Sequence, residues 1–211
     1  MTKPFSLLIK PASYDCNLRC QYCFYLKKAA VYGKVQHRMT TQTLERMISS
    51  YMALNMPQYS FAWQGGEPTL MGVGFFQQAV DFMKKYGYAG KQVSNALQTN
   101  GTLLDDEWGK FFREYSFLLG ISLDGPPEMH NKFRVDAAGK GTHQRVLDGI
   151  EAMRRNNVEF NILTLITPAN VEHPEEVYNY LKQQGIQYHQ YIECVEFDAA
   201  GKLLPFSVTA R

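Results

Sequence analysis

Short apolar runs alternate along this chain with longer segments in which apolar residues recur at helical spacing. The short runs predict six strands, over residues 6–10, 59–64, 92–97, 117–123, 158–164 and 187–194. The longer segments predict five helices between them, over residues 41–55, 74–86, 105–114, 142–156 and 172–184. Repeated strand–helix units are typical of an α/β protein with a parallel sheet and right-handed crossovers.

Residues with known preferences mark the ends of several predicted helices. The hydroxyl of Thr40 or Thr41 is placed to cap the first helix. Two acidic residues open the helix at 105–114, where the positive end of the helix dipole favours them. Pro174 lies in the first turn of the last helix and Gly185 lies just beyond its end. These signals support the alternation of strands and helices.

The segments that follow the predicted strands are polar and rich in glycine. Six parallel strands either curl into a partial barrel or lie open as a doubly wound sheet, and in both cases functional residues gather at the carboxyl ends of the strands. Each segment is also an ordinary turn sequence, but their shared position predicts one site at this rim. The segments are Gln64-Gly65-Gly66-Glu67, Gln98-Thr99-Asn100-Gly101 and Ser122-Leu123-Asp124-Gly125.

Such a rim is suited to a polar cofactor. The glycine pair lets the backbone approach a ligand closely. Arg134 would bind a carboxylate in a fork geometry; the alternative is a solvated loop arginine. The side chains expected to hydrogen-bond the cofactor are Gln64, Glu67, Gln98, Asn100, Ser122 and Asp124.

Composition narrows the class of protein. The chain has 211 residues, 45% of them hydrophobic, which is enough for one sizeable core. The net charge of +2 argues against a polyanionic partner such as nucleic acid. No segment approaches the ~20 apolar residues of a membrane span, and no signal peptide is evident. Four cysteines are too few for a disulfide scaffold, so we expect a soluble protein of the reducing cytoplasm.

Three of the four cysteines, Cys16, Cys20 and Cys23, form a C-x3-C-x2-C motif in the long loop after the first strand. This spacing directs three thiolates towards one point, one ligand short of a closed tetrahedral site. It suggests a cubane iron–sulfur cluster with one iron left open for a substrate or cofactor. The alternative is a structural zinc site completed by Cys194 or a histidine, which would make the chain a binding module.

These motifs together resemble a known family. The cysteine motif, with Tyr22 before its last cysteine, and the Gly65-Gly66-Glu67-Pro68 segment are similar to the radical S-adenosylmethionine (radical SAM) superfamily. Further segments resemble the anaerobic sulfatase-maturating enzymes within it, and the resemblance covers nearly the whole chain. They are residues 6–13, 23–25, 64–70, 97–102, 122–126, 130–131 and 158–163.

The resemblance implies a partial (β/α)6 TIM-like barrel and a radical mechanism. Cys16, Cys20 and Cys23 would hold three irons of a 4Fe-4S cluster, and the open iron would chelate S-adenosylmethionine. One electron, from a donor such as flavodoxin or ferredoxin, would cleave the cofactor to a 5′-deoxyadenosyl radical. That radical would take a hydrogen atom from a cysteine or serine of a sulfatase polypeptide, and oxidation would end at Cα-formylglycine.

The resemblance also implies which residues hold S-adenosylmethionine. Val195 would act through its backbone. The polar rim side chains would lie close to the cofactor. The implied contacts are Tyr22, Gly66, Ser122, Arg134 and Val195, with Gln64, Glu67, Gln98 and Asn100 on the rim beside them.

The chain departs from the family after its last predicted strand. Family members continue into a C-terminal cysteine-rich domain that carries two further clusters and the catalytic base, whereas this sequence ends at Arg211. We therefore expect residues 1–211 to be the radical SAM core domain, which binds both cofactors but does not complete the oxidation alone. Cys194 is expected to be a small buried thiol. Two alternatives stay open: radical modification of another peptide or protein, and a catalytically silent module.

Overall fold

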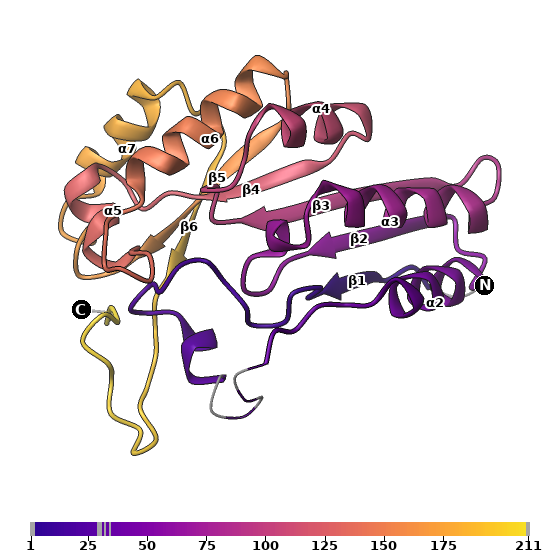
Figure 1. The fold of residues 1–211 in the computed structure, drawn as a ribbon. Coiled ribbons are helices and arrows are strands. Elements are labelled where there is room, and N and C mark those ends of the chain that lie inside the picture. The colour runs from indigo at the N-terminus through magenta and orange to yellow at the C-terminus, as the bar shows by residue number, and fades with distance from the viewer. Residues whose placement is uncertain (1–2, 29–30, 32, 34, 210–211) are drawn as a thin grey trace.

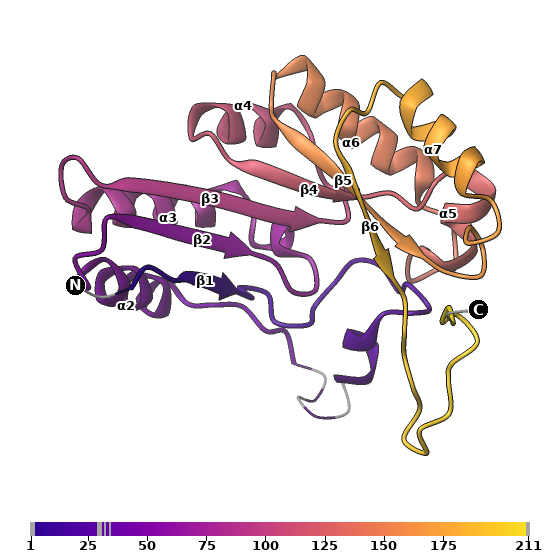
Figure 2. The same cartoon turned by 180° about the vertical axis from the view of Figure 1, so that it is seen from behind.

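The computed structural model describes residues 3–28, 31, 33 and 35–209, and within them six strands form one sheet (Figures 1 and 2). All neighbouring strands pair in parallel, in the order β1-β2-β3-β4-β5-β6. Because β1 and β6 are the two edges, the barrel is open, which confirms the predicted partial barrel of parallel strands. The strands are β1 Ser6–Ile9, β2 Gln58–Trp63, β3 Gln92–Thr99, β4 Leu118–Ser122, β5 Phe160–Ile166 and β6 His189–Glu193.

All five predicted helices are present, and they cover one face of the sheet (Figure 1). Thr40 caps the first of them by accepting a hydrogen bond from the Thr43 amide at 3.1 Å. The longest has 14 residues, and no helix of the described ranges has both the length and the apolar character to cross a membrane. The helices are α2 Thr41–Met52, α3 Val73–Tyr86, α4 Asp106–Glu114, α6 His143–Arg155 and α7 Pro174–Gln183.

The main core lies between the sheet and these helices. In β2, the alternate residues Tyr59, Phe61 and Trp63 are buried. Trp63 packs against two aromatic side chains of α3, whereas Tyr59 and Phe61 pack against Tyr51 of α2. The opposite face of the sheet is the open inside of the barrel, where Leu8 and Leu118 are 59% and 48% exposed. The strand pattern therefore points one face towards the helices and leaves the other open.

Three strands, β4, β5 and β6, begin later than the sequence predicts. For β4 and β5 the reason is that the preceding helices end in Schellman motifs. Ser116 and Asn157 adopt left-handed φ angles of 52° and 54°. The next residues, Phe117 and Val158, each donate a backbone hydrogen bond to the carbonyl five residues earlier. Their apolar side chains thus close the helix end and are buried there instead of extending the strand.

Three short helical segments whose bounds lie within the described residues were not predicted. The 3-10 helices η1 (Phe24–Lys28) and η2 (Pro68–Met71) follow the cysteines and the glycine pair. Helix α5 (Pro127–Phe133) follows β4 and begins with proline, which suits the first helical position. It has only seven residues, too few to show an apolar periodicity in the sequence.

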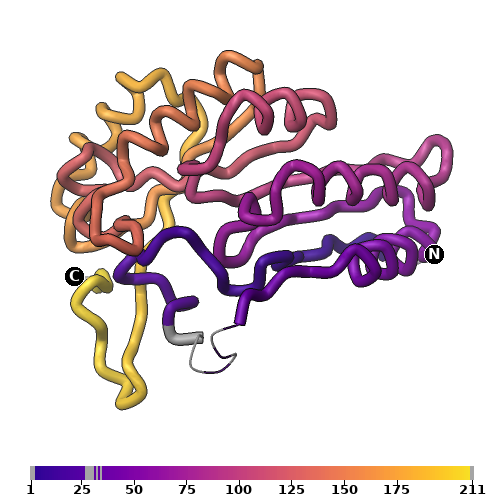
Figure 3. The backbone as a smooth tube through the Cα atoms, viewed as in Figure 1, coloured from indigo at the N-terminus to yellow at the C-terminus, as the bar shows by residue number. Residues whose placement is uncertain are grey.

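The long loop after β1, which contains Cys16, Cys20 and Cys23 and is called the cysteine loop below, crosses the carboxyl end of the sheet. It lies beside the segment that follows β6 (Figure 3). The Arg19 amide donates to the Val135 carbonyl at 2.7 Å and the Gln21 amide donates to the Phe133 carbonyl at 3.0 Å, which ties the loop to the end of α5. A second apolar cluster combines Cys20 with Cys194. The loop is therefore packed into the fold.

Candidate functional site

A pocket of about 430 Å³ opens at the carboxyl ends of the strands. The cysteine loop, the ends of β2 to β5 and the segment after β6 form its walls. It brings together all of the predicted site residues except Glu67 and Asp124. The predicted residues that line it are Cys16, Tyr22, Cys20, Cys23, Gln64, Gly66, Gln98, Asn100, Ser122, Arg134 and Val195.

The three motif cysteines are free thiols that line this pocket. Burial raises the pKa of Cys16 to about 12 and that of Cys20 to about 11, and it also raises the pKa of Cys23. Buried thiols of this kind keep their protons until a metal displaces them. The site is therefore suited to bind a metal centre with release of protons.

The three motif cysteines share one pocket, and the kind of metal centre determines how far apart such ligands stand. Among the residues that the structure describes, no three His, Cys, Asp or Glu side chains are grouped closely enough to share a single metal ion. A four-iron cluster attaches each thiolate to a different iron, so its ligands stand further apart than those of one zinc ion. The three sulfurs line one pocket, and their convergence on one metal centre stays a prediction.

Glu67 does not reach the pocket, in contrast to the expectation that it hydrogen-bonds the cofactor. It is fully buried, and burial raises its pKa. Its carboxylate accepts hydrogen bonds from the amides of Thr69 and Asn100 and from the hydroxyls of Thr69 and Thr99, at 2.7 to 3.0 Å. Glu67 therefore joins the turn after β2 to the turn after β3.

A buried ion pair lies in the wall of the pocket. Arg134 donates to both carboxylate oxygens of Asp124, at 2.8 and 3.0 Å, so the predicted fork geometry is present and its partner is a residue of this chain. Tyr22 donates its hydroxyl hydrogen to the same carboxylate at 2.7 Å. Burial acts to raise the pKa of Asp124, but the charge and hydrogen bonds of Arg134 outweigh it and hold that pKa below its usual value.

His130 and Thr142 lie behind the ion pair, and no role was predicted for either of them. The Asp124 amide donates to Nδ1 of His130, which fixes Nε2 as the protonated nitrogen. Nε2 lies 3.1 Å from the Thr142 hydroxyl, which in turn donates to the Arg134 carbonyl. Burial lowers the pKa of His130 to about 3, so the ring stays neutral.

Other lining residues come from β5, from β6 and from the segment after β6. Leu163 and Leu165 lie on the open face of β5, and Ile192 lies beside Leu165 in the sheet. The sequence could have indicated Leu163 and Leu165 as lining residues, because residues two apart in a strand lie on the same face of the sheet. The remaining lining residues of this region are Glu193, Cys194 and Glu196.

Gly66 supports the back of the pocket, and we expect Gly66→Ala to disrupt it. A Cβ there would lie 2.1 Å from the Asp15 carbonyl oxygen, directly before the first cysteine. The backbone would have to move, at a cost of about 1–3 kcal/mol. We expect urea unfolding to show this loss. Gly74→Ala, in open space within α3, is the control and should keep or raise stability.

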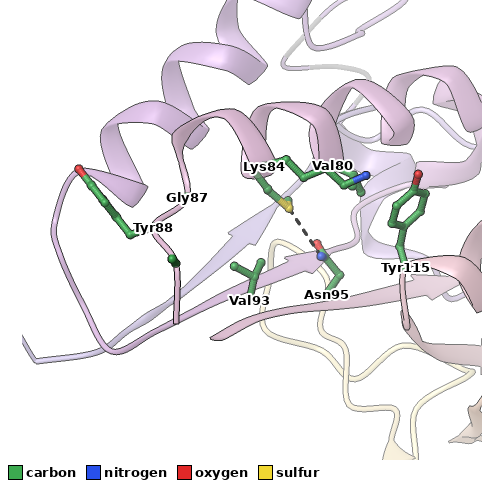
Figure 4. A pocket seen from close by; sticks show the side chains of 9 residues that line it. Val80, Lys84, Gly87, Tyr88, Val93, Asn95 and Tyr115 are labelled. Atoms are coloured by element: carbon green, nitrogen blue, oxygen red, sulfur yellow. Dashed lines mark hydrogen bonds between the residues drawn. The ribbon is translucent and has the colours of Figure 1, made fainter. Parts of the chain in front are cut away.

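A second pocket, of about 410 Å³, lies beside the first half of β3 and the end of α3 (Figure 4). Asn95 holds its floor by donating to the Met83 sulfur at 3.6 Å and accepting from the Trp63 indole at 3.0 Å. The Lys84 ammonium lies over the Tyr115 ring. This pocket contains no cysteine, histidine or carboxylate. The cysteine pocket is therefore the candidate site.

Comparison with known proteins agrees with this geometry. The model of the Radical SAM superfamily matches residues 11–181. A serine-type anaerobic sulfatase-maturating enzyme of Bacteroides thetaiotaomicron is 39% identical over 196 residues, covering 92% of this chain and 47% of the relative. A cysteine-type enzyme of the same kind from Clostridium perfringens is 41% identical over 206 residues, covering 94% of this chain and 55% of the relative.

A solved structure shows the same fold. Native anSMEcpe with bound AdoMet and Cp18Cys peptide superposes with a TM-score of 0.89 at 40% identity. The match covers 98% of this chain and 55% of that one. The chain thus spans about half the length of the curated relatives it matches.

Proposed function

This chain belongs to the radical SAM superfamily, and from that premise we propose that Cys16, Cys20 and Cys23 hold a 4Fe-4S cluster beside a bound S-adenosylmethionine. Both cofactors follow from membership of the superfamily. The observation that supports their placement is a pocket lined both by the three free thiols and by the polar ends of the strands. The donor set fits the cluster, because three thiolates leave one iron without a protein ligand.

The residues of the pocket wall would bind and orient S-adenosylmethionine. Ser122 and the guanidinium of Arg134 offer hydrogen-bond donors for its carboxylate, and Asp124 keeps that guanidinium in place. Gln98 donates to the Ser122 hydroxyl at 3.2 Å and so orients it. Gly66 and Val195 would contact the cofactor through their backbone atoms. When both cofactors are bound, they supply reductive cleavage and hydrogen-atom abstraction.

We propose that the substrate is a cysteine or serine of a sulfatase polypeptide, oxidised to Cα-formylglycine. The support is the similarity to relatives of both the serine type and the cysteine type, together with a solved structure that contains a cysteine peptide. Nearly equal identity to both types leaves both residues as candidates. The electron donor, flavodoxin or ferredoxin, and the reducing cytoplasm belong to the same proposal. The assignment of residues 1–211 to a core domain alone stays a prediction.

The proposal is tested by anaerobic reconstitution of the chain with iron and sulfide. We expect a brown protein that, with dithionite and S-adenosylmethionine, releases 5′-deoxyadenosine. Two sulfatase peptides that differ only in cysteine or serine at the target position then report the substrate, with the aldehyde detected by mass spectrometry. A colourless protein containing zinc would overturn the proposal. Cofactor cleavage with modification of an unrelated peptide would overturn only the substrate.

A further inference from the structure

Resting on the proposed function, we propose that Asn100 donates an N–H···S hydrogen bond to the Cys16 ligand and thereby sets the reduction potential of the cluster. Its side-chain nitrogen lies 3.6 Å from the Cys16 sulfur. The sequence predicted Asn100 as a contact of S-adenosylmethionine. The structure instead assigns it a positioning and tuning role on a cluster ligand.

The orientation of the Asn100 amide is fixed by its neighbours. The Thr102 backbone amide, which can only donate, lies 3.0 Å from Oδ1 of Asn100, and the Thr102 hydroxyl donates to the same oxygen at 2.7 Å. Oδ1 therefore points towards Thr102, and Nδ2 points towards the cysteine loop. The side-chain oxygen and nitrogen of Asn100 cannot be exchanged without losing both bonds.

Both hydrogens of this nitrogen have acceptors in the protein. One is donated to Oδ1 of Asn17 at 2.8 Å and the other is directed at the Cys16 sulfur. Asn17 completes a closed ring by donating to the Thr102 hydroxyl at 2.8 Å. Neither hydrogen is left for S-adenosylmethionine, so Asn100 acts through the cysteine ligand.

Glu67 holds the backbone of Asn100 in this position. Its fully buried carboxylate accepts the Asn100 backbone amide at 2.7 Å. The Glu67 backbone amide donates to the Asp15 carbonyl at 2.8 Å, next to Cys16. Glu67 therefore holds both Asn100, which donates to the Cys16 sulfur, and Asp15, the residue directly before Cys16.

The Cys16 sulfur accepts two N–H bonds in total, because the Leu18 amide also lies 3.3 Å from it. The protonated thiol additionally donates to Oδ1 of Asn17 at 3.8 Å, and this bond disappears when a metal replaces the proton. Hydrogen bonds to cluster sulfurs stabilise the more negative, reduced state. Loss of one such bond should make the cluster harder to reduce.

The test is a redox titration of the reconstituted chain, followed by visible absorbance and by the electron paramagnetic resonance signal of the reduced cluster. We expect Asn100→Leu to shift the midpoint potential to more negative values. Asn100→Asp, which keeps the size and the Thr102 bonds but lacks the N–H, should shift it in the same direction. Gln98→Leu is the matched control, since Gln98 lines the same pocket and bonds Ser122, and it should leave the potential unchanged.

Each outcome of this titration has a separate meaning. Unchanged potentials in both Asn100 variants, or an equal shift in Gln98→Leu, would overturn the tuning role while leaving the proposed function intact. A wild-type chain that takes up no cluster would overturn the proposed function and the tuning role with it.

Discussion

Replacing any one of Cys16, Cys20 and Cys23 with alanine is expected to abolish the release of 5′-deoxyadenosine. Each thiolate would hold a different iron, so the loss of one leaves that iron without a protein ligand and prevents stable assembly of the cluster. After anaerobic reconstitution and addition of dithionite and S-adenosylmethionine, chromatography should show the product only at the level of a protein-free control.

Cys194→Ala is the matched control for this experiment. Its thiol is buried in the same apolar cluster as Cys20 but lies outside the motif, so cleavage should be retained. Cleavage that persists in all three motif variants would refute the ligand roles. Loss of bound metal in Cys194→Ala, with zinc in the wild-type chain, would instead support a four-thiolate zinc site.

Of all the substitutions proposed, removal of the Asp124 carboxylate is expected to lower the free energy of unfolding most. Its side chain is 4% exposed and that of Arg134 is 11% exposed, so Asp124→Leu leaves a buried guanidinium without its counter-charge. Breaking a buried pair in this way costs about 3–5 kcal/mol. Urea unfolding of the metal-free chain should show a lower unfolding free energy, and binding of S-adenosylmethionine should weaken because Arg134 and Tyr22 lose their common partner.

Two further variants separate the ion pair from a general loss of packing. In Asp124→Leu combined with Arg134→Met, no buried charge is left unpaired, so stability should recover towards that of the wild type. Asp106→Asn removes a carboxylate from a pair that is exposed on both sides and should have little effect. A double variant no more stable than Asp124→Leu would contradict the electrostatic explanation.

The order of elements and the position of the site could be predicted from the sequence, because both depend on short-range patterns. Apolar alternation marked the strands, and the carboxyl ends of parallel strands necessarily share one rim. The predicted strand boundaries were less accurate where an apolar residue packs against the end of the preceding helix. Phe117 and Val158 look like strand residues, and only the left-handed residue before each reveals the helix end.

The polar residues at and behind the pocket could be predicted from the sequence, but their hydrogen-bond partners could not. Glu67 and Asp124 each receive donors from segments far apart in the chain, and no local pattern encodes such contacts. A local signal does exist for two turns, since Asp-Ala-Ala-Gly-Lys occurs at residues 136–140 and again at 198–202. In both turns the aspartate side chain accepts amides two and four residues later.

The anchoring of Tyr22 has a consequence for how iron enters the protein. Tyr22 lies between Cys20 and Cys23 in the sequence. Its hydroxyl donates a hydrogen bond to the carboxylate of Asp124, which follows β4. The backbone amides of Arg19 and Gln21 donate hydrogen bonds to carbonyls at the end of α5 and just beyond it. Because these hydrogen bonds lie within the chain, we expect binding of iron and sulfide to require little further loss of conformational entropy in this part of the loop.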